Sequence, residues 1–350
     1  MCTHPMDTTS SSSTDPGGAA LGDPLQSPEA APADPATDAP TFSVVVPTHR
    51  RADLVAEAVA SVVGQTRDDW ECLVVDDGGG ELPDARDPAA LGDPRVRVLR
   101  REHAGGPAAA RNTGIAAARG RIITFLDDDD RYRADRLEIA AAGLTDPAVG
   151  VTICWTSWFA PGDPIGPLPS RLGLAVEQSR SVDPAVGSSV RDRGRDESGW
   201  SGRMLEGNVS DVVLDATTPH LGGTAVRADQ VQRFDERYHA AEDVEWWLRT
   251  AAVSRVSTVA EIGCELRRHP GARLNGPAVA GRLDASHALL AEHADWFAEH
   301  PRAEAFRLAR MGLLALSVGH RGTARHLLLM SLRRHPSGLA ARSLLRTFRR

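Results

Sequence analysis

The sequence predicts an α/β fold in which helices cover a mainly parallel sheet, with a helical extension at the C-terminus. Apolar runs of strand length alternate with helical periodicity between residues 42 and 126. Three of these runs end in polar clusters. From residue 281 onward the pattern is helical and rich in arginine. Alternating strands and helices are typical of parallel sheets, whose strands are joined by crossover helices.

The first 40 residues differ in composition from the rest of the chain. They are mainly Ser, Thr, Pro, Ala, Gly and Asp, with almost no side chains to bury, so we expect this segment to be disordered. It lacks the basic start and apolar core of a secretory signal. No apolar run approaches the roughly 18 residues of a membrane span. These patterns predict a cytoplasmic protein.

The first half of the predicted domain contains four strands and two helices. Pro47 ends the first strand, Gly64 the first helix and Gly120 the second helix. The elements in order are strand 42–47, helix 51–65, strand 70–80 (which breaks into two Asp and three Gly), strand 95–100, helix 106–120 and strand 121–126.

The second half is less regular. We expect a strand over 151–159, a long loop over 160–203, a short strand and turn over 220–231, a helix over 241–253 and a last strand over 257–269. The predicted domains are therefore the segment 1–40, an α/β domain over 41–270 and a helical extension over 271–350.

The extension carries an unusual charge. Between Pro301 and Arg350 a single acidic residue, Glu304, faces a long series of arginines, and the whole chain contains no lysine. A helical stripe of Ala341, Leu344, Leu345 and Phe348 lies among these arginines. Two hypotheses follow: helical hairpins that pack on the domain, or peripheral attachment to anionic lipid or to a membrane partner.

Polar clusters follow three of the predicted strands, at Thr48–His49, Asp76–Asp77 and Asp127–Asp130. The carboxyl ends of parallel strands share one edge of a sheet, where ligands bind in such folds. Two carboxylates about 5 Å apart repel by roughly 3 kcal/mol at an effective dielectric of ~20. Four adjacent aspartates therefore need solvent, as in a plain turn, or a hard cation such as Mg²⁺ or Mn²⁺. The formal net charge of −7 argues against nucleic acid as a partner.

Three segments carry a resemblance to a known family. SVVVPTHRRADLVAEAVASVVGQTRDDWECLVVDDGG, AAARNTGIAAARGRIITFLDDDDRY and AEDVEWWLR look like the family 2 glycosyltransferases of GT-A fold, over roughly residues 42–270. The resemblance implies a Rossmann-like GT-A domain and a DXD motif that holds Mn²⁺ or Mg²⁺ on the diphosphate of a nucleotide sugar. Asp127, Asp128 and Asp129 occupy that motif.

Alternate acids at the end of an extended strand can present oxygens to one hard cation, so we expect Asp129 and either Asp127 or Asp128 as the ligands. We assign Asp127 and Asp129 to the metal and Asp128 to the diphosphate. His269 resembles a late histidine that contacts the metal or the phosphates in many GT-A proteins. A surface histidine is the alternative.

The resemblance also assigns the base and the nucleotide site. Asp243 matches the aspartate of the ED motif, which is the base in inverting members, and Glu242 is a weaker candidate. Simple pairing of acids with the helix N-terminus is the alternative for both. Thr48 and Asp77 match positions that meet the nucleotide base and ribose, with Asp76 beside them and a lean toward uridine, and Arg111 matches an arginine near the diphosphate. A turn formed by Asp-Asp-Gly and a solvated helix arginine are the alternatives there.

We therefore expect a metal-dependent, inverting glycosyltransferase. Its donor would be a nucleoside diphosphate sugar, and its acceptor a hydroxyl of a glycan, a lipid-linked or a small molecule, in cell-envelope or capsular polysaccharide synthesis. The alternatives are a glycosyltransferase acting on a metabolite or protein, and a non-catalytic module that binds nucleotide sugars or glycans. Such a module would be indifferent to loss of Asp243.

Overall fold

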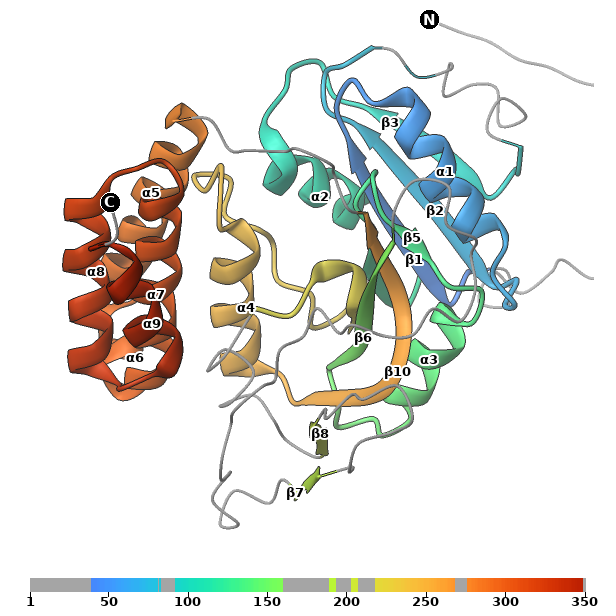
Figure 1. Cartoon of the computed structure of the whole chain (residues 1–350). Helices are drawn as coiled ribbons and strands as arrows, with labels where there is room; N and C mark the ends of the chain where they lie inside the picture. The colour runs from blue at the N-terminus through green and yellow to red at the C-terminus, as the bar shows by residue number, and fades with distance from the viewer. Residues whose placement is uncertain are drawn as a thin grey trace, which may run out of the picture. The chain divides into compact units, whose positions relative to one another are not determined.

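An eight-stranded sheet forms the centre of the molecule (Figure 1). The structure is a computed structural model that describes residues 39–80, 82, 92–159, 189–192, 203–206, 218–267 and 276–348. The strands of the sheet are β1 (Phe42–Thr48), β2 (Trp70–Asp76), β3 (Val96–Arg100), β4 (Ile122–Phe125), β5 (Arg131–Tyr132), β6 (Val151–Phe159), β9 (Thr224–Arg227) and β10 (Val256–Arg267). The predicted segment 1–40, apart from its last two residues, and most of the loop 160–203 lie outside the described residues.

The strand order is β3-β2-β1-β4-β9-β6-β10-β5. Strands β3, β2, β1 and β4 are mutually parallel, as are β6 and β10. Strand β9 runs antiparallel to both of its neighbours, β4 and β6. The predicted α/β class with a mainly parallel sheet is confirmed. The antiparallel β9 brings the start of one strand to the edge where the parallel strands end.

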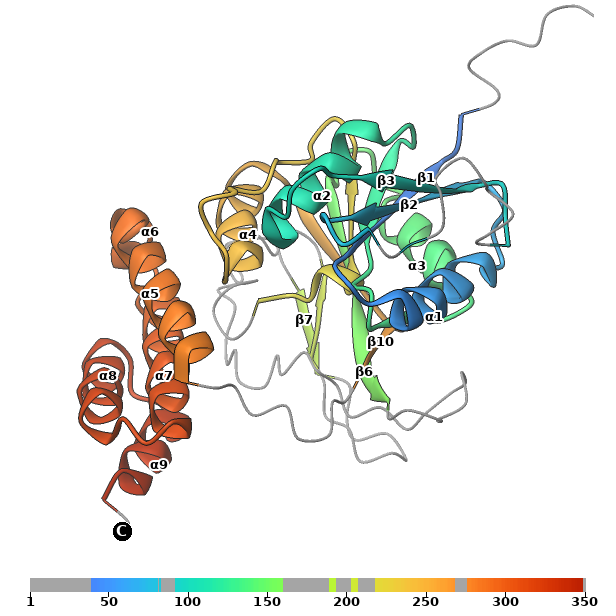
Figure 2. The same ribbon diagram turned by 90° about the horizontal axis from the view of Figure 1, so that it is seen from above.

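Helices cover both faces of the sheet (Figure 2). Helices α1 (Ala52–Val63) and α3 (Arg136–Gly143) pack on one face, and α2 (Gly106–Ala117) and α4 (Glu242–Val253) pack on the other. The alternation of side chains along a strand divides the core accordingly. Val44 and Val46 of β1 belong to the cluster beneath α1, whereas Val45 belongs to the cluster beneath α2 and α4.

Two tryptophans fill the core beneath α4. Trp246 stacks on Phe234 at a centroid distance of 5.3 Å, and the indole N–H of Trp247 donates to the carbonyl of Pro219 at 3.1 Å. Both indoles are fully buried. Their role is packing, and neither is available to stack on a sugar ring.

Five helices follow the sheet over residues 276–346 of the described chain. They are α5 (Gly276–Glu292), α6 (Ala294–Glu299), α7 (Pro301–Ser317), α8 (Arg321–Arg334) and α9 (Gly338–Arg346). Leu289, Phe297 and Ala303 from α5, α6 and α7 join the same core cluster as Phe125 and Trp246 of the α/β part. The helices of the extension therefore share a core with the domain, as the packing hypothesis expects.

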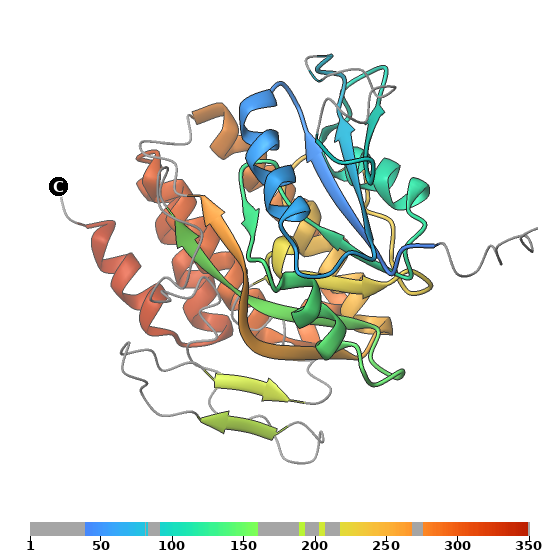
Figure 3. The ribbon, with the colours of Figure 1, turned by 90° about the vertical axis from the view of Figure 1, so that its right-hand side faces the viewer.

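A separate two-stranded sheet comes from the region predicted as a loop. Strands β7 (Ser189–Asp192) and β8 (Arg203–Glu206) pair antiparallel (Figure 3).

No helix in the described part of the chain combines the length and apolar character needed to span a membrane. Cys72, Cys154 and Cys264 are buried free thiols.

Candidate active site

The carboxyl edge of the sheet gathers the polar clusters that follow β1, β2 and β4. The register pairs Thr48 with Asp76, and the backbone N–H of Asp77 donates to the carbonyl of Thr48 at 2.9 Å. The hydroxyl of Thr48 donates to the Asp128 carboxylate at 2.7 Å. Residues from three strands therefore meet at one place, as the sequence pattern predicts.

The four aspartates form a turn. The backbone N–H of Asp130 donates to the carbonyl of Asp127 at 3.1 Å, which closes the chain over three residues. Asp127 and Asp130 therefore face the same side, while Asp128 and Asp129 face Arg51, which lies 2.9 Å and 3.2 Å from their carboxylates. The expected pairing of Asp127 with Asp129 assumed the alternation of an extended strand, but β4 ends at Phe125. The structure groups Asp127 with Asp130 instead, and which of the aspartates bind a metal stays a prediction.

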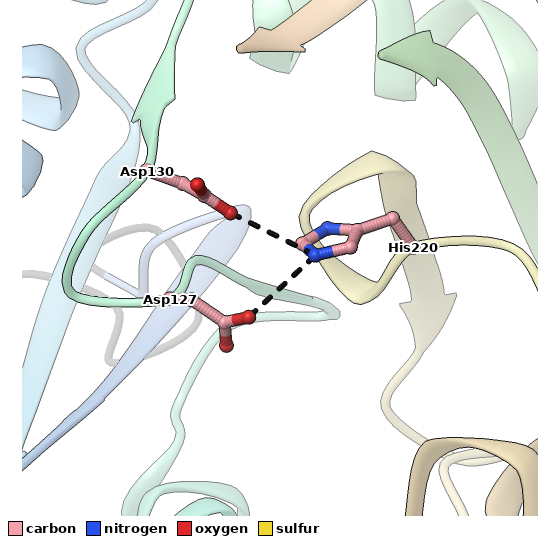
Figure 4. A group of neighbouring side chains, drawn as sticks. All are labelled: Asp127, Asp130 and His220. Atoms are coloured by element: carbon pink, nitrogen blue, oxygen red, sulfur yellow. Dashed lines mark ion pairs between the residues drawn. The ribbon is translucent and has the colours of Figure 1, made fainter. Parts of the chain in front are cut away.

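Asp127 and Asp130 lie beside His220 (Figure 4). The His220 Nε2 is 3.7 Å from a carboxylate oxygen of each aspartate. Among the described residues, this is the group of acid, histidine or cysteine side chains close enough to share one metal ion. His269, the histidine proposed from the resemblance, lies outside the described residues.

His220 reaches this edge because β9 is antiparallel. Strand β9 begins at Thr224 beside the end of β4, so the residues that precede it lie at the carboxyl edge. The short 3₁₀ turn η3 (Leu221–Gly223) connects His220 to the strand, and Gly222 donates its N–H to His220 Nδ1 at 3.2 Å. Sequence reasoning missed His220. The signal was a histidine directly before a Gly-Gly turn and a short strand, but only the strand order reveals its neighbours.

The glycines of η3 permit close packing. A Cβ on Gly222 would lie 2.6 Å from Cys264 Sγ, and one on Gly223 would lie 2.7 Å from the carbonyl oxygen of Cys154. Real Cβ atoms do not approach so closely, so both positions require glycine. The two glycines therefore let η3 pack closely against strands β6 and β10 of the sheet.

The electrostatics of the two aspartates differ. Burial acts to raise the pKa of Asp127, but the Arg111 guanidinium and the His220 ring outweigh it and hold the pKa below its usual value. Burial, together with the negative charge of Asp127, raises the pKa of Asp130 well above its usual value. Asp130 therefore carries the electrostatic strain of two close carboxylates, which a cation would relieve.

Arg111 connects the aspartate turn to the start of α4. Its guanidinium donates to Asp127 at 2.7 Å and to Glu242 at 2.9 Å, while its buried Nε has no hydrogen-bond partner among the described residues. Burial raises the pKa of Glu242, assisted by the charge of Asp243 and opposed by that of Arg111. Arg111 is thus a buried, paired cation at the site.

Asp243 lies at the first turn of α4, and its carboxylate accepts the backbone N–H of Val244 at 2.8 Å. The residue before this helix, Ala241, has a left-handed backbone with φ of 61°. That conformation costs a non-glycine residue roughly 1–2 kcal/mol. Arg50 at the end of β1 is the other such residue in the described part of the chain, with φ of 54°. Strained residues of this kind gather at functional sites.

Asp76 and Asp77 hold their own loop. The Asp76 carboxylate accepts the N–H groups of Gly79 at 2.8 Å and Gly80 at 3.0 Å. The Asp77 carboxylate accepts the N–H of Gly106 at 2.7 Å and pairs with Arg101 at 2.5 Å. These contacts give both aspartates a structural role at the turn and at the start of α2. A contact with nucleotide stays a prediction.

Asp127, Arg111, Glu242 and Asp243 line a cavity of about 680 Å³. His220 lines it as well, and the opposite wall comes from α5 and α7. Metal-ligand candidates, a buried arginine and the candidate base thus share one cavity.

Comparison with known proteins supports the resemblance. Residues 43–183 match the family model described as glycosyl transferase family 2. The succinoglycan biosynthesis protein ExoO of Rhizobium meliloti is 43% identical over 104 residues, which are 29% of this chain and 30% of that protein. The UDP-Glc:alpha-D-GlcNAc-diphosphoundecaprenol beta-1,3-glucosyltransferase WfgD of Escherichia coli is 36% identical over 97 residues, 28% of this chain and 38% of that one. The matches thus span less than two fifths of either relative.

Solved structures resemble the chain over a longer stretch but at lower identity. The mannosyltransferase PcManGT from Pyrobaculum calidifontis, in complex with GDP-Man and Mn²⁺, covers 88% of this chain and 79% of its own at 20% identity and a TM-score of 0.48. TarS 1-349 from S. aureus, in complex with UDP-GlcNAc, covers 85% of this chain and 89% of its own at 16% identity and a TM-score of 0.48. The predicted resemblance to family 2 glycosyltransferases is confirmed by the family model and the named relatives.

Proposed function

We propose that this chain, which carries a family 2 glycosyltransferase region, is a metal-dependent, inverting glycosyltransferase. It would transfer a sugar from a nucleoside diphosphate donor to an acceptor hydroxyl. One observation carries the proposal: Asp127 of the aspartate turn, Arg111 and the Glu242–Asp243 pair all line one cavity at the carboxyl edge of the sheet. The names of the relatives support polysaccharide assembly as the setting.

The residues at the turn fit a divalent cation. Asp127 and Asp130 offer carboxylate oxygens, which Mn²⁺ and Mg²⁺ prefer, and the raised pKa of Asp130 reflects repulsion that a cation removes. His220 Nδ1 accepts a hydrogen bond, so in the neutral ring the proton is on Nε2, facing the carboxylates. We therefore assign Asp127 and Asp130 as the ligands, with His220 joining them after a change of tautomer. The bound ion would neutralise charge on the diphosphate leaving group.

Asp243 serves as the base in this proposal. The hydroxyl oxygen of the acceptor forms a bond to the anomeric carbon as the bond from that carbon to the diphosphate oxygen breaks. The hydroxyl proton passes to the Asp243 carboxylate, because a hydroxyl is too weak an acid to attack unaided. Arg111 adds positive charge beside Asp127 and fixes Glu242 next to the base.

A turnover measurement on an Asp243→Asn variant tests this function. Asparagine keeps an oxygen that can accept the Val244 N–H but cannot take a proton, so turnover should fall by ~10² or more. UDP-sugars and GDP-sugars, with and without Mn²⁺, should raise the Tm of the variant by as much as that of the wild type. The variant still binds the donor, and a ligand that binds the folded state stabilises it. Unchanged turnover would remove Asp243 from the mechanism. A wild type that no nucleoside diphosphate stabilises would refute the function itself.

Peripheral membrane contact is a further part of the proposal. Leu345 on α9 and Phe348, two residues after its end, are exposed, and Arg342 and Arg346 lie beside them in the sequence. Exposed apolar side chains among arginines favour a surface of anionic lipid. We propose that this face of α9 rests on the membrane and brings the enzyme to a lipid-linked acceptor.

A further inference from the structure

The cavity at the candidate active site has two walls of opposite charge. Asp127, Glu242 and Asp243 come from the α/β part. Facing them are side chains of the C-terminal helices, with Arg282 on α5 and Arg307 and Arg310 on α7, and the hydroxyl residues Ser286 and Ser317. The resemblance to the glycosyltransferase family does not extend to these helices, so their arginines need an explanation of their own.

Two of these arginines carry charges that no carboxylate in the described part of the chain neutralises. Arg282 and Arg310 are exposed, and within the described residues neither forms an ion pair with a carboxylate. By contrast, Arg51, Arg111 and Arg267 at the same edge of the sheet are each paired with carboxylates. Free guanidinium groups lining a cavity are suited to bind an anion, because charge-assisted hydrogen bonds are stronger than neutral ones.

Arg307 lies deeper in the same wall. Its guanidinium donates to the Thr218 hydroxyl. Burial lowers the pKa of Arg307 to about 10, and the negative charge of Asp243 offsets this only in part, while the charge of Arg310 lowers it further. The side chain therefore remains charged at neutral pH, in a place where a second negative group would stabilise it.

We infer that this cavity is the acceptor site, and that the acceptor carries a phosphate or diphosphate group held by Arg282, Arg307 and Arg310. The inference rests on the proposed function and names the substrate class of that same site. Three guanidinium groups match the charge and the several oxygens of a phosphate better than a single carboxylate. The donor diphosphate belongs to the opposite wall, at Asp127 and Asp130. Asp243 lines the same cavity and is close enough to Arg307 for its charge to act on that guanidinium, so a hydroxyl of a phosphorylated sugar can reach Asp243 while the phosphate is held.

Isothermal titration of the full chain with Mn²⁺ and UDP present tests the inference. The probes are glucose 1-phosphate and N-acetylglucosamine 1-phosphate, each compared with its neutral methyl glycoside. The phosphorylated sugar should bind at least ~10-fold more tightly, since a hydrogen bond between charged groups contributes roughly 1.5–3 kcal/mol. The preference should weaken as salt is raised.

The Arg282→Gln/Arg310→Gln double variant should lose this preference. Both side chains are exposed, so the variant should fold, and its thermal unfolding is measured alongside. The matched control is Arg333→Gln, an exposed arginine on α8 outside the cavity, which should keep the preference. Arg307 is left unchanged because of its contact with Thr218.

Several outcomes would overturn the inference. Equal binding of phosphorylated and neutral sugars, or no binding of either in a protein that binds UDP, would exclude a phosphate subsite. A double variant that retains the preference would exclude these arginines. If the double variant instead loses affinity for UDP to the same degree, the arginines hold the donor diphosphate. If the wild type does not bind UDP, the proposed function itself is refuted, whatever the affinity for the phosphorylated sugars.

Discussion

At the scale of single residues, the four aspartates of the turn differ in how well the surrounding residues compensate their charges. Asp128 accepts the Thr48 hydroxyl and Asp129 pairs with Arg51, so both have partners inside the fold. Asp130 accepts the backbone N–H of Arg267 at 2.9 Å but is buried close to Asp127. Asp127 is paired with Arg111 as well, which leaves Asp130 as the carboxylate whose charge the surrounding residues compensate least. A cation would therefore gain the most there.

Replacing Asp130 by Asn should stabilise the metal-free protein and remove its response to metal. The pKa of Asp130 is raised in the folded state, so its contribution to stability is present below the unfolded pKa and is lost as pH rises through the folded value. Asparagine keeps an oxygen for Arg267 without the charge. Melting curves in EDTA from pH 4 to pH 8 should therefore show a higher Tm for the variant toward neutral pH. Added Mn²⁺ should raise the Tm of the wild type alone.

Asp129→Asn is the matched control, because its carboxylate faces Arg51 in the neighbouring position of the same turn. This control should keep the Mn²⁺ response. If Asp129→Asn loses the Mn²⁺ response while Asp130→Asn retains it, the metal ligands are the alternate aspartates Asp127 and Asp129 expected from the sequence. The assignment of Asp127 and Asp130 as ligands would then be wrong.

At the scale of elements, strand order determines which residues meet. Strand β9 inserts antiparallel between β4 and β6, and η3 at its start positions His220 against the aspartate turn. Gly223 has no room for a Cβ because the Cys154 carbonyl lies beneath it. The position of His220 therefore depends on the packing of two glycines on the sheet.

A Gly223→Ala substitution should destabilise the fold by roughly 1–3 kcal/mol, the usual cost of overpacking. The new methyl group must displace either η3 or β6, so the Tm increase caused by Mn²⁺ should shrink as well. Chemical denaturation with and without Mn²⁺ measures both effects. The control is Gly322→Ala on α8, which has no atom within 4 Å of its would-be Cβ. It should be neutral or stabilising by up to ~1 kcal/mol. Equal behaviour of the two variants would contradict the packing argument.

The elements also show where sequence patterns suffice and where they fail. Strands β1, β2, β4 and β6 and helices α1, α2 and α4 follow from apolar runs, helical periodicity and turn residues. Helix α3 is not predicted from the sequence because it begins with a charged residue, Arg136. This arginine is fully buried, and its Cζ lies 5.3 Å from the centroid of the Tyr132 ring. Strand β5 is not predicted either, because its Arg131 is charged yet buried, with its Nε 2.6 Å from a carboxylate oxygen of Glu265. Buried arginines paired across the fold break the apolar pattern, and only tertiary structure explains them.

The candidate site divides in the same way. The resemblance to the family motifs singles out Asp127, Arg111, Glu242 and Asp243, and the structure places all four on the lining of one cavity. The register of the aspartates and the presence of His220 depend on a turn and on an antiparallel neighbour. The arginines of α5 and α7 depend on how the extension packs, which periodicity does not specify.

At the scale of the whole molecule, the C-terminal helices have two faces with different surroundings. One face joins the core through Leu289, Phe297 and Ala303 and lines the cavity. On α9, Ala340 and Ser343 are buried. The stripe predicted for this helix is not buried as a unit, since Leu345 and Phe348 are 66% and 63% exposed. Packing and membrane contact are therefore compatible, because they use different sides of the extension.

The Leu345→Ser/Phe348→Ser double variant tests the membrane side. Both side chains are exposed, so the free energy of unfolding should change little. Each would contribute up to roughly 1.5–3 kcal/mol if it entered the lipid interface, so sedimentation with vesicles containing phosphatidylglycerol should fall at least ~10-fold. Val253→Ser at the end of α4, where the side chain is 68% exposed, is the control and should sediment like the wild type. Neutral phosphatidylcholine vesicles should bind the wild type weakly, because the arginines of α9 then have no anionic lipid to face. If the wild type fails to sediment with anionic vesicles, or the double variant sediments equally well, α9 has no such role and the acceptor must reach the cavity from solution.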